Sequence, residues 1–399
     1  MKIFSISRPA IFAIIEGFFA ECNRILEKPA WSALDNVSWT DELEVGSGGL
    51  DINTEDLSIY LDSISEFFDM PETAFENASV GNKIGDWVSI IKAHCDQQML
   101  QFHFRPAGSK VLCGEKITKP VNDDVPIQVC SHRVDALYQE ASAVANLLQG
   151  RRRLITMVSP HSLLGLVVGT LMPALQKIEI VDARHLSPDE LTQTLDYGDV
   201  LVATPSLWAY LIRENIHGPD NIMAVSFGEM MSADLAVKLR RNGFGVMREL
   251  YGSTQTGLVA WRDTPNDDFI LFDHWSRKGD DLIRYFPDGV EKSIVPMDFF
   301  DWKTSRSFSL SGRRDGAVQI GAVNVFPSKI EAIICQLEQI DKCSIRVVKT
   351  DLGTNRLIAD VFLLEKIAPD EKMARILDGW CRSQLAIHER PHILNFYTS

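Results

Sequence analysis

Short apolar runs alternate with helix-like segments between residues 125 and 260, and this alternation restricts the fold more than any other feature. Segments with helical spacing of apolar residues follow the runs RLITMVS, KIEIVDA, DVLVATP and IMAVSFG. Strands that are apolar on both sides, with helices between them, predict a parallel sheet covered on both faces. We therefore predict an α/β fold for this region.

Polar and small residues follow the predicted strands in four places, namely SPHS, ATPSL, SFGEMMS and YGSTQTG. Ligands of open α/β sheets bind outside the carboxyl ends of the strands. The four segments are therefore expected to form one rim and a binding site. YGSTQTG has many more small residues than a surface turn needs, although a plain glycine-rich turn is the alternative interpretation.

The rest of the chain indicates two further kinds of structure. Residues 1–100 have mainly helical spacing, and residues 265–314 contain β-rich runs such as FILFDHW and SFSLSGRR. Beyond the turn-prone RRDG, residues 315–399 have the pattern of a compact α+β unit. We predict a large domain over 1–314 (helical 1–100, α/β 101–264, β-rich 265–314) and a small domain over 315–399.

Composition limits the partners and the compartment. Forty basic and 54 acidic residues give a formal charge of −14, which argues against nucleic acid as a partner. Seven scattered cysteines form no zinc or disulfide pattern and fit a reducing cytoplasm. No apolar run is long enough to span a membrane, and Glu16 interrupts the N-terminal one, so we expect an amphipathic helix there rather than a signal peptide. The oligomeric state stays open, with a homodimer as one option.

Several motifs resemble those of the adenylate-forming superfamily, which includes acyl-CoA synthetases, peptide-synthetase adenylation domains and luciferases. YGSTQTG is similar to the YGSTE-type loop of that family, and SGRRDGAVQIGAVNVFPSKIEAII resembles its hinge segment. VNVFPSKIE is most similar to the phenylacetate–CoA ligase branch, and the short chain also resembles adenylating proteins of phenazine (griseoluteic acid) biosynthesis. ATPSLW and SFGEMMS stand in the matching order, so the resemblance covers about residues 100–399.

The resemblance implies an ATP- or AMP-binding site. It implies catalytic roles at the phosphate for Thr254 and Gln255, ribose contacts for Asp301 and Arg313, and an adenine-lining loop at Gly228 and Glu229. The remaining nucleotide contacts that it implies are Tyr251, Gly252 and Ser253.

The resemblance also implies an acyl pocket and a mobile small domain. The acyl pocket would contain His161, Tyr251 and Gly257, and the small domain would turn about a hinge at Asp315. The alternative interpretations are a surface acid for Asp301, a turn former for Asp315 and a core histidine for His161.

Three departures from the family pattern bear on activity. The phosphate-binding loop is degenerate and keeps only the Gly108–Ser109–Lys110 part, because FRPAGSKVLCGEK has proline, alanine and apolar residues where the family has Ser, Thr and Gly. Gln255 replaces the family glutamate and is a weak ligand for Mg²⁺. The sequence stops at RPHILNFYTS, before the segment in which family members carry an adenylating lysine.

The expected function is ATP- and Mg²⁺-dependent adenylation of an aromatic carboxylic acid, with a phenazine carboxylate as the favoured substrate. A carrier-protein thiol, CoA, an amine or a reductase partner would then accept the acyl group. The alternative is a nucleotide- or acyl-binding scaffold protein of the same fold with impaired catalysis. Since no GxGxxG follows the first strand, a nicotinamide oxidoreductase is disfavoured.

Overall fold

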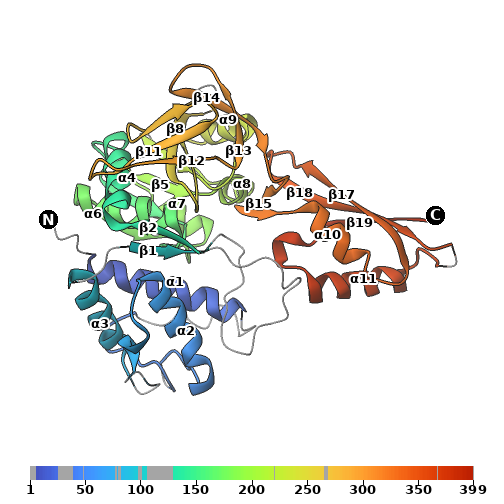
Figure 1. Ribbon diagram of the computed structural model, residues 1–399, viewed down its shortest axis with the longest axis horizontal. Helices are drawn as coiled ribbons and strands as arrows, with labels where there is room; N and C mark the ends of the chain where they lie inside the picture. Colours follow the sequence, from blue (N-terminus) through green and yellow to red (C-terminus); the bar gives the residue numbers. More distant parts are fainter. Residues whose placement is uncertain are drawn as a thin grey trace.

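The computed structural model describes residues 6–25, 39–47, 49–76, 79, 82–97, 101–105, 129–219, 221–264, 268–365 and 367–398. A helical layer, a large mixed sheet with helices on both faces, and a smaller C-terminal lobe follow one another along the chain (Figure 1). None of the helices in the described ranges is long and apolar enough to cross a membrane.

The N-terminal layer, predicted to be mainly helical, contains α1 (Arg8–Ile25), α2 (Thr54–Phe67), the short η2 (Glu72–Phe75) and α3 (Ile84–Gln97). Their apolar faces meet in an aromatic core. The Phe19 ring lies 4.6 Å from Tyr60 and 6.1 Å from Trp87, centroid to centroid. Burial of such large rings is the main stabilising term of a helical layer.

A nine-stranded sheet forms the centre, in the order β13-β14-β9-β8-β7-β6-β5-β3-β4. Its parallel half consists of β3 (Arg153–Thr156), β4 (Glu179–Asp182), β5 (Val200–Ala203), β6 (Ile222–Ser226) and β7 (Phe244–Ser253). Every residue of β5 and β6 is buried, as expected for strands covered on both faces. The predicted parallel arrangement is confirmed for this half of the sheet.

Two helical layers cover the parallel strands. Alternate strand residues face two separate cores, with Val200 and Val202 in one and Leu201 and Ala203 in the other. The first core lies under α1, α4 (Val134–Leu147), α5 (Leu163–Leu166) and the π-helical η4 (Val167–Leu171), after which α6 (Met172–Gln176) follows. The second core lies under α7 (Pro188–Thr194), α8 (Pro205–Arg213) and α9 (Ala233–Arg241).

Antiparallel strands extend the same sheet. The added strands are β8 (Gly257–Asp263), β9 (Phe269–Leu271), β13 (Asp298–Trp302) and β14 (Ser307–Arg313). A separate three-stranded sheet consists of β10 (Trp275–Lys278), β11 (Asp281–Tyr285) and β12 (Glu291–Ile294), and a hairpin-like pair consists of β1 (Gln101–Phe104) and β2 (Cys130–Arg133). The β-rich segment is thus mostly a continuation of the main sheet.

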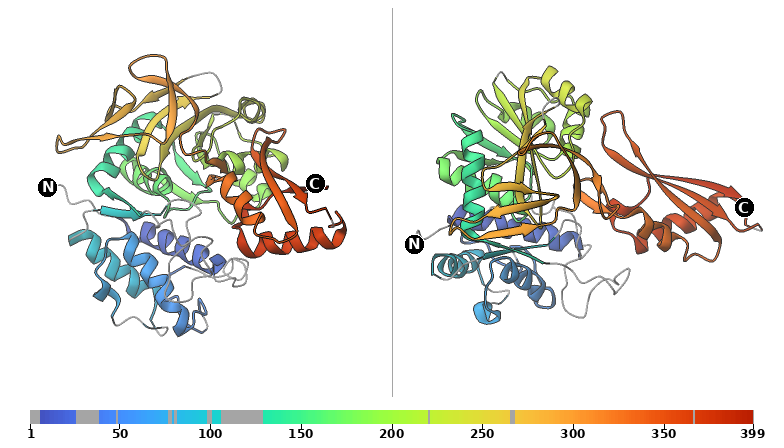
Figure 2. Two further views of the ribbon diagram at one scale, coloured as in Figure 1. Left: turned by 45° about the vertical axis from the view of Figure 1, so that its right-hand side comes forward. Right: turned by 45° about the horizontal axis from the view of Figure 1, so that its top comes forward.

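The C-terminal lobe has its own core, built from residues between Ile320 and Leu385. Its elements are β15 (Val318–Ile320), β16 (Val323–Val325), α10 (Pro327–Ile334), β17 (Ile340–Lys349), β18 (Asn355–Leu363), α11 (Glu371–Gln384), η5 (Ile387–Glu389) and β19 (Ile393–Thr398). The lobe projects from one side of the large sheet in all views (Figure 2).

Contacts of the lobe with the larger part of the molecule include those of Leu352 and Ala322. Ser232 donates its hydroxyl hydrogen bond to the Leu352 carbonyl over 2.8 Å, and the Leu352 side chain joins the core under α8 and α9. A Cβ added to Gly228 would lie 3.0 Å from the Ala322 Cβ. These contacts bring the lobe onto the rim at the carboxyl ends of the strands.

Candidate functional site

The glycine-rich stretch forms a tight hairpin between β7 and β8, with Thr254–Thr256 as its turn. A Cβ on Gly252 would lie 2.3 Å from the Gly257 carbonyl oxygen, so only glycine allows the two strands to approach this closely. The Ser253 and Thr256 hydroxyls bond to each other over 3.0 Å across the turn. Thr254 is half-buried and Gln255 is exposed, so the tip is open to a ligand.

Four side chains form a polar group beside this turn, which we call the Tyr251 cluster: Tyr251, Asp298, Arg313 and Asp315. Tyr251 donates a hydrogen bond of 2.5 Å from its hydroxyl to Asp298 Oδ2. Arg313 Nη1 lies 3.6 Å from Asp298 Oδ1. Arg313 also makes a two-pronged pair with Asp315, with distances of 2.9 and 2.6 Å. Asp298 and Arg313 are direct partners in the β13–β14 ladder, which fixes their separation.

The charges of the Tyr251 cluster follow from its surroundings. Burial, reinforced by Asp298, raises the pKa of the Tyr251 hydroxyl well above its ordinary value. The hydrogen bond from Arg313 lowers the pKa of Asp315, and the same bond raises the pKa of Arg313. At neutral pH the cluster therefore holds a neutral Tyr251 phenol beside the Arg313–Asp315 ion pair, and Asp298 accepts the phenol's hydrogen bond.

Asp301, the carboxylate that sequence analysis assigned to the ribose, lies elsewhere on β13. Its side chain is 58% exposed and pairs with Lys303. Phe300 and Trp302 contact the core, and Asp301 stands between them on the opposite face. The structure brings Asp298, and not Asp301, to Tyr251 and Arg313.

The predicted adenine loop lies under the C-terminal lobe. Gly228 has a φ of +91° and faces Ala322. Burial raises the pKa of the Glu229 carboxyl, whereas hydrogen bonds from Ser206 and the Ala322 backbone lower it. Within the described residues, Glu229 Oε1 has no hydrogen-bond partner. Glu229 is thus a buried polar residue at the contact between the large sheet and the C-terminal lobe.

His161, expected in an acyl pocket, is held by α1. Its Nε2 lies 3.0 Å from Glu21 Oε2, and its ring lies 4.7 Å from the Phe18 ring. A Cβ on Gly17 would approach His161 Nδ1 to 2.4 Å, so the imidazole sits directly on the bare helix backbone. These contacts anchor the loop after β3, and the structure does not bring His161 to Tyr251 or Gly257.

Of the expected phosphate contacts and metal ligand, the structure describes Thr254 and Gln255. Gly108, Ser109 and Lys110 lie outside the described residues. In the described part of the chain, no group of three or more His, Cys, Asp or Glu side chains could hold a metal ion. Mg²⁺ binds through carboxylates and substrate phosphates, and the exposed Gln255 amide does not fit that role.

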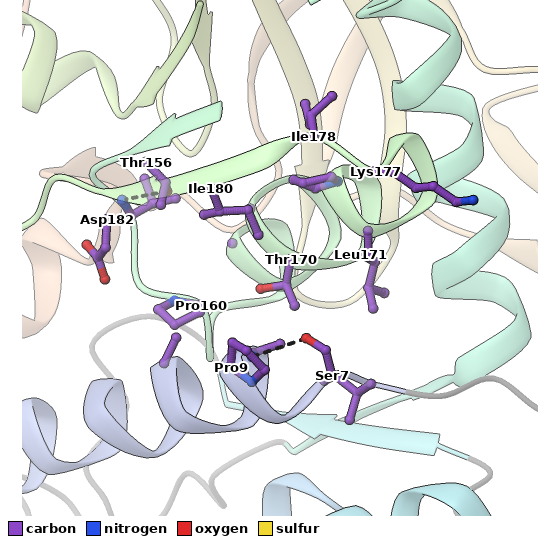
Figure 3. A pocket seen from close by; sticks show the side chains of 18 of the residues that line it. Ser7, Pro9, Thr156, Pro160, Thr170, Leu171, Lys177, Ile178, Ile180 and Asp182 are labelled. Carbon is purple, nitrogen blue, oxygen red and sulfur yellow. Dashed lines mark hydrogen bonds between the residues drawn. The ribbon is translucent and has the colours of Figure 1, made fainter. Parts of the chain in front are cut away.

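A cavity of about 480 Å³ lies on the same rim but at its far edge (Figure 3). Its lining includes Pro9 from α1, Thr156 at the end of β3, Pro160, Thr170 and Ile180. The Lys177 side chain points away from it (Figure 3). Tyr251 lies on β7, three strands from β3, which corresponds to about 14 Å at the usual strand spacing. The cavity is therefore separate from the Tyr251 cluster.

Sequence reasoning missed three residues beneath the turn, of which Glu140 and Arg284 are buried and His132 is half-buried. Glu140 on α4 accepts a hydrogen bond of 3.0 Å from the Leu258 N–H, and Arg284 Nη2 lies 3.2 Å from Glu140 Oε1. His132 Nε2 lies 2.7 Å from the Thr254 carbonyl oxygen. The only local signal is that Glu140 and Arg284 each interrupt an apolar run, and this does not reveal their partners.

The chain has relatives among named ligases. A 4-coumarate–CoA ligase from Halorhodospira halophila is 27% identical over 338 residues, which cover 84% of this chain and 82% of that protein. A second 4-coumarate–CoA ligase, from Rhodobacter capsulatus, is 26% identical over 341 residues and covers 82% of each chain. No family model matches the chain.

Solved structures share the fold. The amide bond synthetase McbA from Marinactinospora thermotolerans aligns with 96% of this chain and 90% of its own, with a TM-score of 0.57 and 12% identity. A malonyl-CoA ligase complex with methylmalonyl-CoA and AMP has a TM-score of 0.54, 14% identity and coverage of 70% and 69%.

Together, the relatives and the fold support the adenylate-forming superfamily. The chain is an enzyme related to these CoA ligases and synthetases.

Proposed function

We propose that this enzyme activates an aromatic carboxylic acid with ATP, using the Tyr251 cluster and the adjacent turn as its nucleotide site. The acid's carboxylate oxygen attacks the α-phosphorus and pyrophosphate leaves, which yields an acyl-adenylate. The proposal depends chiefly on one observation, the joining of Tyr251, Asp298 and Arg313 beside the glycine-rich turn.

Each group of the cluster has a role that its chemistry suits. The Asp298 carboxylate can accept both vicinal hydroxyls of a ribose, and it takes the part that the sequence assigned to Asp301. The permanently charged Arg313 can contact ribose or phosphate. Thr254 and the backbone N–H groups of the open turn can donate to the α-phosphate, where negative charge develops during the reaction.

The Gly228–Glu229 loop is proposed to line the adenine. The loop is buried beneath Ala322 of the C-terminal lobe, so lobe movement about Asp315 would open or close it. Asp315 holds both Arg313 and the Ala317 N–H. It therefore connects the last strand of the large sheet to the start of the lobe.

The substrate class and the acceptor have separate support. The relatives are named 4-coumarate–CoA ligases, a name that contains an aromatic acid and CoA. This favours an aromatic acid as the substrate and the CoA thiol as the acyl acceptor. The phenazine carboxylate, the carrier-protein or reductase acceptor and the phenylacetate–CoA ligase branch rest on the motif resemblance alone. Mg²⁺ would reach the site with the ATP phosphates, since Gln255 offers no carboxylate.

The neutral and exposed Gln255 favours a second candidate, a protein that binds nucleotide and acid as a scaffold but adenylates poorly. Acid-dependent exchange of labelled pyrophosphate into ATP separates the two, measured with a panel that includes cinnamates, benzoates, phenylacetates and phenazine carboxylates. The proposed function predicts exchange well above the acid-free control for at least one aromatic acid. AMP binding without exchange for any acid would favour the scaffold, and absence of nucleotide binding would contradict both.

A further inference from the structure

The turn that carries Thr254 and Gln255 is held from below by side chains distant in sequence. Glu140 is 118 positions from Leu258, and its carboxylate accepts the Leu258 backbone N–H over 3.0 Å. Gly257 has a φ of +76°, and a Cβ there would lie 2.3 Å from Glu140 Oε1. The carboxylate therefore lies directly against the backbone that closes the turn.

Arg284 on β11 fixes this carboxylate. Its Nη2 lies 3.2 Å from Glu140 Oε1 and also donates to the Ala136 carbonyl on α4. The guanidinium lies 5.3 Å from the Trp275 ring centroid and 5.7 Å from that of Phe286. The Glu140 and Arg284 side chains are only 1% and 3% exposed. Loss of either one would leave the other charge buried without a partner, at a high cost in free energy.

His132 on β2 holds the other end of the turn. Its Nε2 lies 2.7 Å from the Thr254 carbonyl oxygen. Burial, reinforced by Arg284 and Lys292, lowers the pKa of His132, although the Thr254 carbonyl opposes that shift. The ring is therefore neutral near pH 7 and must carry its proton on Nε2 to donate to a carbonyl.

We propose that Glu140 is a positioning residue, which together with Arg284 and His132 sets the position of Thr254 and Gln255 at the rim. No atom of Glu140 need touch the nucleotide, since it acts through the Leu258 N–H and the Gly257 backbone. The consequence for catalysis rests on the proposed function, but the effect on the turn does not.

Glu140 also makes the turn sensitive to pH. Burial raises the pKa of the Glu140 carboxyl to about 7, while Arg284 and the Leu258 N–H act to lower it. Arg284 of β11 is the charged group that faces the carboxyl directly. Asp135 of α4 raises the pKa of Arg284, and Lys292 of β12 lowers the pKa of His132. An ionised carboxylate accepts a stronger hydrogen bond than a protonated one, so the turn is held more firmly as pH rises through 7.

The test compares Glu140→Gln with Asp199→Asn by hydrogen–deuterium exchange. Asp199 is a matched control because it is 1% exposed and pairs with Arg153, at the opposite ends of the strands from the turn. In Glu140→Gln, the side chain is neutral and has one acceptor oxygen. It can accept a hydrogen bond from Arg284 or from the Leu258 N–H, but it cannot replace both carboxylate interactions. We expect the rate of deuterium exchange of residues 252–260 to rise on the order of tenfold in Glu140→Gln. Asp199→Asn should leave the exchange rate of that segment unchanged.

A second readout separates positioning from a merely structural role. In the wild type, kcat of pyrophosphate exchange should rise through about pH 7. In Glu140→Gln that inflection should disappear, and kcat should fall more than KM for ATP changes. Unchanged uptake over 252–260, or a retained inflection, would overturn the proposal.

Two outcomes keep the inference distinct from the proposed function. If the wild type exchanges no pyrophosphate, the proposed function fails and deuterium uptake still decides the inference. If Glu140→Gln does not fold, Arg284→Lys replaces it, since this change keeps the charge but loses the planar fork. Faster uptake over 252–260 is again expected, and equal uptake would contradict the inference.

Discussion

Gly257 shows how strongly a single position depends on its neighbours. Its φ of +76° excludes most side chains, and the Glu140 carboxylate occupies the place of a Cβ. Gly289 has a similar φ of +84° but has no atom within 4 Å of that place. A substitution at Gly289 therefore measures the free-energy cost of the backbone conformation alone, whereas one at Gly257 adds the cost of steric crowding.

Replacing Gly257 by alanine should reduce the free energy of unfolding much more than replacing Gly289 by alanine. The left-handed conformation alone costs about 1 kcal/mol for alanine. Displacing the buried Glu140 from Gly257 should bring the total there to about 2–4 kcal/mol. Urea unfolding measures both, and equal losses would show that Glu140 does not crowd Gly257.

Asp298 and Asp301 illustrate what the sequence leaves undecided at this scale. Both lie in MDFFDW, and an alternating strand puts residues three apart on opposite faces. Phe299, Phe300 and Trp302 are all apolar, so the pattern does not say which face is buried. The ladder pairing of Asp298 with Arg313, 15 positions later, supplies the answer and is visible only in the fold.

At the scale of elements, α1 holds two of the rim loops. Glu21 contacts His161 after β3, and Glu16 pairs with Arg184 and His185 after β4. The hydrogen bond to Glu16 raises the pKa of His185, against the effect of burial. A polar side of the amphipathic helix thus faces the sheet rim.

The Glu16–His185 pair makes a pH-dependent contribution to stability. A histidine with a raised pKa in the folded state stabilises the protein fully below its unfolded pKa of about 6.5, and this contribution is lost as pH rises through the folded pKa. Glu16→Gln should therefore lower Tm more at about pH 5.5 than at about pH 8.5.

His185→Asn is the control for that experiment. The Arg184 pair persists at both pH values, so only the His185 part should vary. In the Glu16→Gln, His185→Asn double variant the pH dependence of the Glu16→Gln effect should vanish. A Tm loss that is equal at both pH values would contradict this assignment.

The order of strands and helices could be predicted because each strand has an apolar run, which is buried in β3, β5 and β6 and mostly exposed in the edge strand β4. The runs RLITMVS, KIEIVDA, DVLVATP and IMAVSFG contain β3, β4, β5 and β6 in that order. The supports of the turn could not be predicted, since His132 lies 122 positions from Thr254. Such pairings depend on how α4, β2 and β11 come together, and local patterns do not encode that.

For the whole molecule, the main question is how firmly the C-terminal lobe sits on the rim. Leu352 is 8% exposed and packs into the core under α8 and α9, next to the Ser232 hydrogen bond. Leu364 belongs to the same lobe but is 44% exposed.

Leu352→Asp should release the lobe, because a buried unpaired carboxylate is costly. X-ray scattering in solution should show a larger radius of gyration, and trypsin should cut faster at Arg313 and Arg314, which precede the lobe. Leu364→Asp should change neither measurement. Identical scattering from Leu352→Asp and the wild type would mean that Leu352 does not hold the lobe in place.

The Tyr251 cluster is the proposed place where the nucleotide binds. The most direct measurement is calorimetric titration of AMP into the wild type, Asp298→Asn and Asp301→Asn, with Asp301 serving as the exposed control on the same strand. We predict that Asp298→Asn binds AMP about 10- to 100-fold more weakly, as expected for loss of a charged hydrogen-bond partner, and that Asp301→Asn stays within about twofold of the wild type. Loss of binding in Asp301→Asn with wild-type affinity in Asp298→Asn would contradict the account.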